Sequence, residues 1–145
     1  MQNPPGPPSG PPPGPPPGPQ SNPQATTSSG MDKKTAATLS YLLWWITGVI
    51  FLFVGKDDPD VKFHAAQSII FFGAITVLRI IFGIVGAFTL AGVMFFLSSV
   101  LLLIGIIYWI IALYKSWTGN GARFELPLVG GVITPYAEQI AGAVK

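Results

Sequence analysis

Two long apolar runs, separated by a short charged loop, dominate the chain after its first 34 residues; the first is uncharged, and the second has Arg79 as its one charged residue. The first run, Thr35–Gly55, has 21 residues, and the second, Phe63–Tyr114, has 52. A helix rises about 1.5 Å per residue, so about 20 residues cross a hydrocarbon core of ~30 Å. The second run is therefore long enough for two crossings. The pattern predicts three transmembrane helices and places them near 36–55, 65–86 and 91–114.

Turn and capping residues set the expected ends of these helices. Asp58 followed by Pro59 is typical of an N-cap with proline at the first helical position, which starts the second span. Two glycines at 86–92 predict the hinge between the second and third spans. Thr134 before Pro135 predicts one more, short helix near 135–144 by the same cap-and-proline pattern.

These elements predict an all-α integral membrane helical bundle with three transmembrane helices, preceded by a disordered tail rich in proline and glycine. The expected organisation has three parts: a proline-rich tail at 1–34, a three-span domain at 35–117 and a C-terminal tail at 118–145.

The first 30 residues contain twelve prolines and five glycines, with no charged and no aromatic side chain. Glycine recurs there every four residues at 6, 10, 14 and 18, whereas a collagen helix needs glycine at every third position. With almost nothing apolar to bury, we expect this segment to be disordered with local polyproline II character. It is either a semi-rigid spacer or a ligand for a proline-recognition partner.

Composition supports a membrane protein and excludes several other classes. Charged residues make up 10% of the chain, against roughly 25% in soluble globular domains, and hydrophobic residues make up 50%. The chain has no cysteine, which excludes a disulfide scaffold and a thiol enzyme. The net charge of +2 comes from scattered lysines, so no nucleic-acid partner is expected. We expect the cell membrane as the location and the lipid bilayer as the surrounding medium.

Four polar side chains lie inside the second span. His64, Gln67 and Ser68 are three and four residues apart and so share one helix face. Arg79 follows Ser68 by eleven residues, a rotation of only ~20°, and extends the polar stripe toward the middle of the membrane. A charge at that depth should face protein or water rather than lipid. In a functional role, Arg79 binds an anion or a lipid headgroup or forms part of a polar pathway. In a structural role, it is hydrogen-bonded within the bundle or extends its side chain to the nearer membrane surface.

No catalytic, cofactor-binding or metal-binding set emerges from the residues. His64 has no second strong metal ligand nearby, and no acid is placed to orient it toward a nucleophile such as Ser68. The acidic loop with Asp57, Asp58 and Asp60 lacks the spacing of a calcium loop and is interpreted as a capped, solvated turn. We therefore expect a protein that is not an enzyme and needs no cofactor.

The segment Phe63-His64-Ala65-Ala66-Gln67-Ser68, after a first span and a charged loop, resembles the Tic-twenty-like family. These are small bacterial and archaeal membrane proteins of unknown function related to a protein-import component of the plastid inner envelope. The stretch from Gly119 to Arg123, followed by Leu126-Pro127-Leu128-Val129-Gly130, is also similar to that family. The resemblance implies a multi-pass helical protein associated with protein translocation, with His64 and Gln67 as a shared signature.

Two functions follow as hypotheses. The first is a non-enzymatic multi-pass membrane protein that acts by interaction with membrane protein partners, accessory to protein translocation. The alternative is a small homo-oligomeric channel or carrier with Arg79 on its pathway. Three spans place the tail and the C-terminus on opposite sides. Counting Lys and Arg near the span ends gives two on the tail side and four on the other, which favours an external tail and a cytoplasmic C-terminus.

Overall fold

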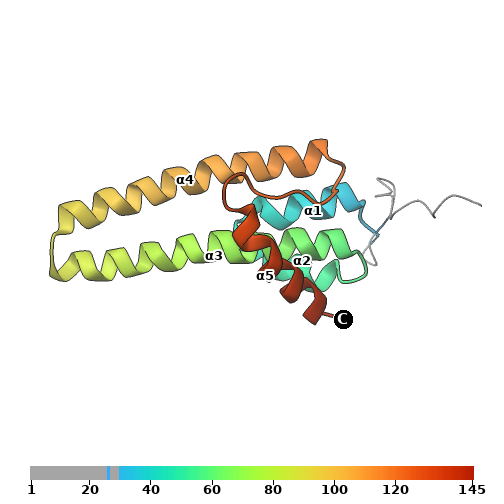
Figure 1. Ribbon diagram of the computed structural model, residues 1–145, viewed down its shortest axis with the longest axis horizontal. Helices are drawn as coiled ribbons and strands as arrows, with labels where there is room; N and C mark the ends of the chain where they lie inside the picture. The colour runs from blue at the N-terminus through green and yellow to red at the C-terminus, as the bar shows by residue number, and fades with distance from the viewer. Residues whose placement is uncertain (1–25, 27–29) are drawn as a thin grey trace, which may run out of the picture.

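The computed structural model describes Thr26 and residues 30–145, and within them it is all α-helical. Most of the predicted proline-rich tail therefore lies outside the described residues. The five helices, shown in Figure 1, are α1 (Lys33–Leu42), α2 (Trp45–Val54), α3 (Pro59–Phe88), α4 (Ala91–Thr118) and α5 (Gly130–Ala143).

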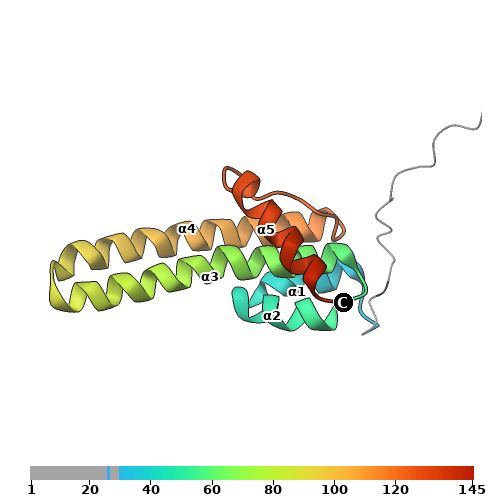
Figure 2. The ribbon, with the colours of Figure 1, turned by 60° about the horizontal axis from the view of Figure 1, so that its bottom comes forward.

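Helices α3 and α4 form a long antiparallel hairpin that runs the length of the molecule (Figures 1 and 2). They have 30 and 28 residues, and each is long and apolar enough to cross a membrane. The predicted cap of α3 is confirmed: the Asp58 carboxylate accepts from the backbone N–H groups of Asp60 and Val61 at 2.8 and 3.2 Å. The hairpin turn falls at Thr89 and Leu90, inside the predicted hinge.

The first predicted span, 36–55, is not a single helix, and this expectation was wrong. The chain stops being helical at Leu43 and Trp44, and α2 runs back beside α1 toward the end where α1 began (Figure 1). Trp44 has a φ of 59°, which turns the chain sharply between two helices of 10 residues each. Each of these helices is half the length that a membrane crossing requires.

Polar side chains explain how the chain can break among apolar residues. The Thr47 hydroxyl accepts from the Leu43 N–H at 3.1 Å and donates to the Ser40 carbonyl at 3.2 Å. Ser68 of α3 donates to the carbonyl of Trp44 at 2.7 Å. The indole N–H of Trp109, on α4, donates to the carbonyl of Tyr41 at 2.9 Å. Backbone groups that a continuous helix would pair internally are thus paired by three other side chains.

The Trp44 ring fixes the break against the long hairpin. Its centroid lies 5.1 Å from that of Phe72, and it also packs on Gly105 of α4. A Cβ atom at Gly105 would lie 2.8 Å from the indole, so glycine is the residue that admits the ring at this contact.

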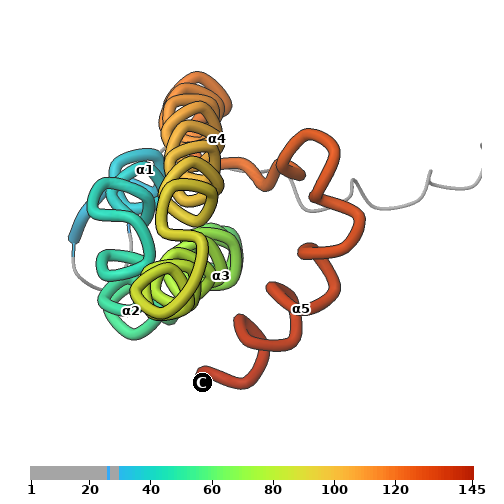
Figure 3. The backbone as a smooth tube through the Cα atoms, turned by 90° about the vertical axis from the view of Figure 1, so that its left-hand side faces the viewer, coloured from blue at the N-terminus to red at the C-terminus, as the bar shows by residue number. Residues whose placement is uncertain are grey.

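The C-terminal segment returns along the other side of the α3–α4 hairpin, opposite α1 and α2 (Figure 3). After Gly119 the chain is irregular up to Val129 and then forms α5. The short helix expected near 135–144 starts earlier, at Gly130, and contains Pro135 in its interior. Ile133 and Ala137 are buried, so packing holds the first turns of α5 although proline interrupts helical hydrogen bonding.

The molecule therefore has two unequal parts. We call the part formed by α1, α2, α5, residues 119–129 and the adjoining ends of α3 and α4 the head. Residues 76–104, which form the rest of the α3–α4 hairpin and its turn, are the distal hairpin. Among the residues that the structure describes, all side chains of the buried apolar core lie in the head. The starts of α1 and α3, the ends of α2 and α4, and the C-terminus lie together at the head's outer end (Figures 1 and 2).

Candidate functional site

A cluster of polar side chains is buried at the centre of the head. His64, Gln67 and Ser68, predicted to share a face of their helix, are all 0% exposed, and so is Tyr41 of α1. We call these four residues the polar cluster. Phe63, which precedes them, is 2% exposed and packs in the neighbouring apolar core.

His64 connects α3 to the segment that follows α4. Its Nε2 atom lies 3.0 Å from the carbonyl oxygen of Ala122 and 3.3 Å from that of Gly121. Carbonyl oxygens can only accept, so Nε2 carries a hydrogen and donates it. The other ring nitrogen, Nδ1, lies 3.0 Å from the Tyr41 hydroxyl oxygen. In the neutral ring Nδ1 is an acceptor, so this contact needs the Tyr41 hydrogen.

Gln67 competes for the same hydrogen. The Tyr41 hydroxyl lies 2.6 Å from Gln67 Oε1, and the Gln67 amide donates to the carbonyl of Phe124 at 3.3 Å. One phenolic hydrogen is therefore placed between two acceptors, Nδ1 of His64 and Oε1 of Gln67. This arrangement makes Tyr41 the link between α1 and the rest of the polar cluster.

Ser68 does not form a nucleophile pair with His64. Its hydroxyl donates to the carbonyl of Trp44, at the break between α1 and α2. The polar cluster thus joins the two interrupted segments of the head, the α1–α2 turn and residues 121–124, to the continuous helix α3.

A group of ion pairs lies at the outer end of the head. Asp60 pairs with Lys33 of α1 and, at 2.7 Å, with Nε of Arg123. Arg123 also donates to the carbonyl of Pro59 at 3.2 Å, and Lys62 donates to the carbonyl of Val144 at 2.9 Å. The acidic loop is thus occupied by structural contacts, with Asp58 capping α3 and Asp60 binding two cations. The described residues contain no group of three or more His, Cys, Asp or Glu side chains placed to hold a metal ion.

Arg79 lies on the same helix as the polar cluster but in the distal hairpin, away from it. Its guanidinium donates through Nη1 to the carbonyl of Ser98, on α4, at 2.7 Å. Nine residues separate Arg79 from Phe88, the last residue of α3, which is about 14 Å of helix. Arg79 therefore lies closer to the hairpin turn than to the outer end of the head.

Sequence reasoning found His64, Gln67 and Ser68 but missed their partners. By sequence, Tyr41 and Trp109 are expected to belong to aromatic belts at the membrane interface, and the carbonyls of residues 121–124 carry no side-chain signal. One signal was present for the break: Ser40 and Thr47 bracket Leu43 and Trp44, and small hydroxyl residues can pair freed backbone groups.

Comparisons with known proteins identify the family of this chain. Residues 32–133 match the model of the magnetosome magnetite crystal formation protein family. The chain belongs to this family. A UPF0132 membrane protein of Methanocaldococcus jannaschii is 40% identical over 112 residues, which cover 77% of this chain and 94% of the relative. A UPF0132 membrane protein of Archaeoglobus fulgidus is 38% identical over 114 residues, covering 79% of this chain and all of the relative. No solved structure matches the chain.

Membership in the magnetosome magnetite crystal formation family overturns the Tic-twenty-like resemblance. The matched region contains both segments on which that resemblance rested, Phe63–Ser68 and the stretch from Gly119 to Gly130. Two short segments are a weaker basis for a family than the match over residues 32–133. The expected link to protein translocation loses its basis with it. The relatives and the two long apolar helices agree that the chain is a membrane protein, as predicted.

We predict that Tyr41→Phe destabilises the head. The substitution removes the only hydroxyl hydrogen between His64 and Gln67 and leaves a buried acceptor unpaired, which costs about 1–3 kcal/mol. The free energy of unfolding, measured by denaturant titration in mixed micelles, should fall by that amount. Tyr114→Phe is the control, because the Tyr114 side chain is 68% exposed. Equal stability of the two variants would contradict the role assigned to the hydroxyl.

Proposed function

We propose that this chain is a non-enzymatic membrane protein that works by lateral assembly in the bilayer, first of all with further copies of itself. In this proposal the head lies at the cytoplasmic face, α3 and α4 are the two membrane-spanning helices, and the α1–α2 turn enters the membrane and returns. The distal hairpin makes the contacts between copies.

The single observation that carries the proposal is the isolation of the distal hairpin. Figures 1 and 2 show its two helices extending side by side beyond α1, α2 and α5. Large apolar side chains are exposed along both of them, among them Ile84 at 59%, Phe88 at 85% and Phe96 at 65%. From Phe63 to Phe88 the apolar part of α3 is about 39 Å long, which exceeds a core of ~30 Å. Such excess length is accommodated by tilting or by local thickening of the bilayer, and the free-energy cost of this mismatch drives some helix–helix association.

Charge supports the orientation. Seven of the eight Lys and Arg residues of the sequence lie at the outer end of the head or in the tails there, and the eighth is Arg79 within α3. The turn at Thr89 and Leu90 carries no charge. Lys and Arg near the ends of spans are retained in the cytoplasm. The α1–α2 turn brings the start of α1 to the end of the head where the other cations lie, so a one-sided distribution replaces the expected margin of four against two and supports a cytoplasmic start of α1.

Descriptions of the relatives are compatible with this proposal. The family description names magnetite crystal formation, and the archaeal relatives are described as UPF0132 membrane proteins. The proposal rests on residence in a membrane, which the descriptions of the archaeal relatives state. The channel or carrier hypothesis, with Arg79 on the pathway, stays a prediction. Solute flux in liposomes that is lost in Arg79→Leu while assembly persists would favour it.

Cysteine labelling tests the orientation, because the chain contains no cysteine of its own. We predict that a membrane-impermeant thiol reagent on intact cells labels Thr89→Cys but neither Asp32→Cys nor Asp57→Cys. All three positions are exposed, so burial does not explain a difference. Permeabilised cells, in which all three should react, are the control. Labelling of only one of Asp32→Cys and Asp57→Cys would show that α1 and α2 cross the membrane.

Disulfide crosslinking tests the assembly. We predict that Ile84→Cys and Phe96→Cys, both on the distal hairpin, give crosslinked dimers in native membranes under mild oxidation. Gly142→Cys is the matched control, since it is exposed and lies in the head at the end of α5. Monomers for both distal variants, or equal crosslinking of all three, would contradict assembly through the distal hairpin.

A further inference from the structure

Arg79 has more hydrogen-bond capacity than the chain uses. A guanidinium carries five N–H donors, and the bond to the Ser98 carbonyl is the one that Arg79 makes among the described residues. Its side chain is only partly buried, between helices whose other exposed side chains are mostly large and apolar. A cation in such a medium requires further polar partners.

No carboxylate of this chain can reach Arg79. All six Asp and Glu residues lie outside 63–118, at the outer end of the head or in the segments next to it. A second copy in the same orientation would therefore also bring no acidic side chain to the level of Arg79. The partner that balances this charge has to come from outside the protein, and it has to be an anion available within the membrane.

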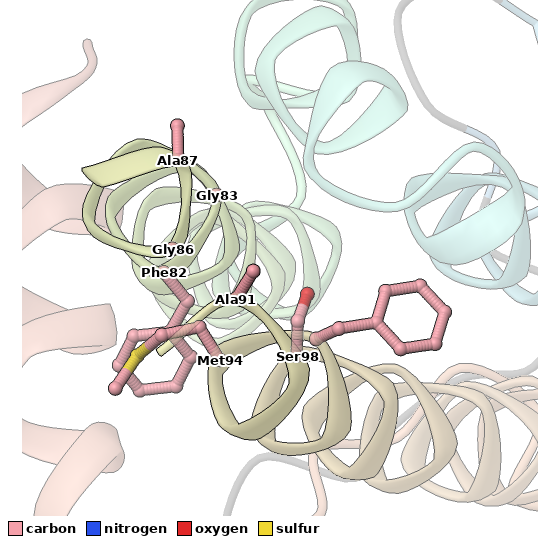
Figure 4. A pocket seen from close by; sticks show the side chains of 8 residues that line it. Phe82, Gly83, Gly86, Ala87, Ala91, Met94 and Ser98 are labelled. Carbon is pink, nitrogen blue, oxygen red and sulfur yellow. The ribbon is translucent and has the colours of Figure 1, made fainter. Parts of the chain in front are cut away.

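A groove lies between α3 and α4 on the side of Arg79 nearer the hairpin turn, and Ser98, whose carbonyl binds Arg79, is one of its lining residues. Phe82, Gly83 and Gly86 follow Arg79 by three, four and seven residues, so they share its face of α3. Ser98 lies on the opposite wall with Met94 (Figure 4). The groove has a volume of about 340 Å³. A Cβ added at Gly83 would meet no atom within 4 Å, so this part of the groove is open space.

We propose that the groove binds an anionic phospholipid of the leaflet that surrounds the hairpin turn. The phosphate accepts from the free N–H groups of Arg79, and an acyl chain lies along the small and apolar residues between Phe82 and Met94. Arginine suits this role because its planar fork binds phosphate through two parallel hydrogen bonds. Arg79 is about 14 Å from the end of α3 and 20 residues from its start at Pro59, so the leaflet around the hairpin turn is the nearer one.

This proposal is independent of assembly between copies, because the groove lies between α3 and α4 of one chain. The lipid is identified by its chemistry alone: a negative headgroup phosphate for Arg79 and an apolar chain for the groove. A zwitterionic lipid offers the same acyl chains with no net negative charge, so it provides the comparison that isolates the electrostatic part.

Native mass spectrometry of the full chain in detergent, titrated with phosphatidylglycerol, tests the proposal. We expect Arg79→Gln to weaken phosphatidylglycerol binding by about tenfold, as expected for the loss of charge-assisted hydrogen bonds. Arg79→Lys, which keeps the charge but loses the planar fork, should bind with intermediate affinity. Gly83→Phe should weaken binding while leaving Arg79 in place, because the ring fills the groove. Phosphatidylcholine should bind the wild type more weakly than phosphatidylglycerol does.

Lys56→Gln is the matched control, because it removes the same charge from an exposed residue at the outer end of the head. It should leave the tightest phosphatidylglycerol site unchanged. The proposal is overturned if Arg79→Gln binds as well as the wild type, if phosphatidylcholine binds equally well, or if Lys56→Gln has the same effect. Loss of dimers in Arg79→Gln with unchanged lipid binding would assign Arg79 to a second copy and would also overturn it. Should Arg79→Gln fail to fold, Gly83→Phe alone decides, since unchanged binding in that variant contradicts the lipid site.

Discussion

Backbone N–H and C=O groups that are freed inside an apolar medium must find partners within the protein, and this constraint organises the head. In lipid each unpaired group costs several kcal/mol, so an interrupted helix persists only where other groups pair its ends. The interruption at Leu43 and Trp44 meets this requirement with hydroxyls of Thr47 and Ser68 and with the indole of Trp109. Because these side chains come from α2, α3 and α4, satisfying the break also fixes how the helices pack.

The same logic applies to the irregular segment after α4. Its carbonyls at Ala122 and Phe124 accept from His64 and Gln67, so the polar cluster serves this second interruption as Ser68 serves the first. Tyr41, on α1, connects the two interruptions by its contacts with His64 and Gln67. Polar residues that were candidates for a functional site thus form hydrogen bonds with non-helical backbone. Arg79 differs from them because its guanidinium retains donors that the chain does not use, and for that reason it is the residue to which we assign a ligand.

Long apolar runs and local capping motifs in the sequence predicted much of the fold. The long apolar run at 63–114 indicated two helices, and local cap chemistry at Asp58 and Pro59 placed the start of α3. Hydropathy could not reveal the break in the first run, because Leu43 and Trp44 are as apolar as their neighbours and their partners are distant in sequence. Contacts such as Trp44 with Gly105 exist only after folding. The stripe of His64, Gln67 and Ser68 was visible from helical spacing, but its role depended on carbonyl groups that no sequence pattern marks.

The distance between the two ends of the α1–α2 segment tests the central claim most directly. Spin labels on cysteines at Asp32 and Phe53, both exposed, can be measured by pulsed electron paramagnetic resonance in the full chain reconstituted in bilayers. If α1 and α2 fold back on each other, the labels are roughly 10–20 Å apart, as expected for neighbouring helices. A single continuous helix would separate them by about 32 Å. The account predicts the shorter distance, and a population centred on the longer one would contradict it.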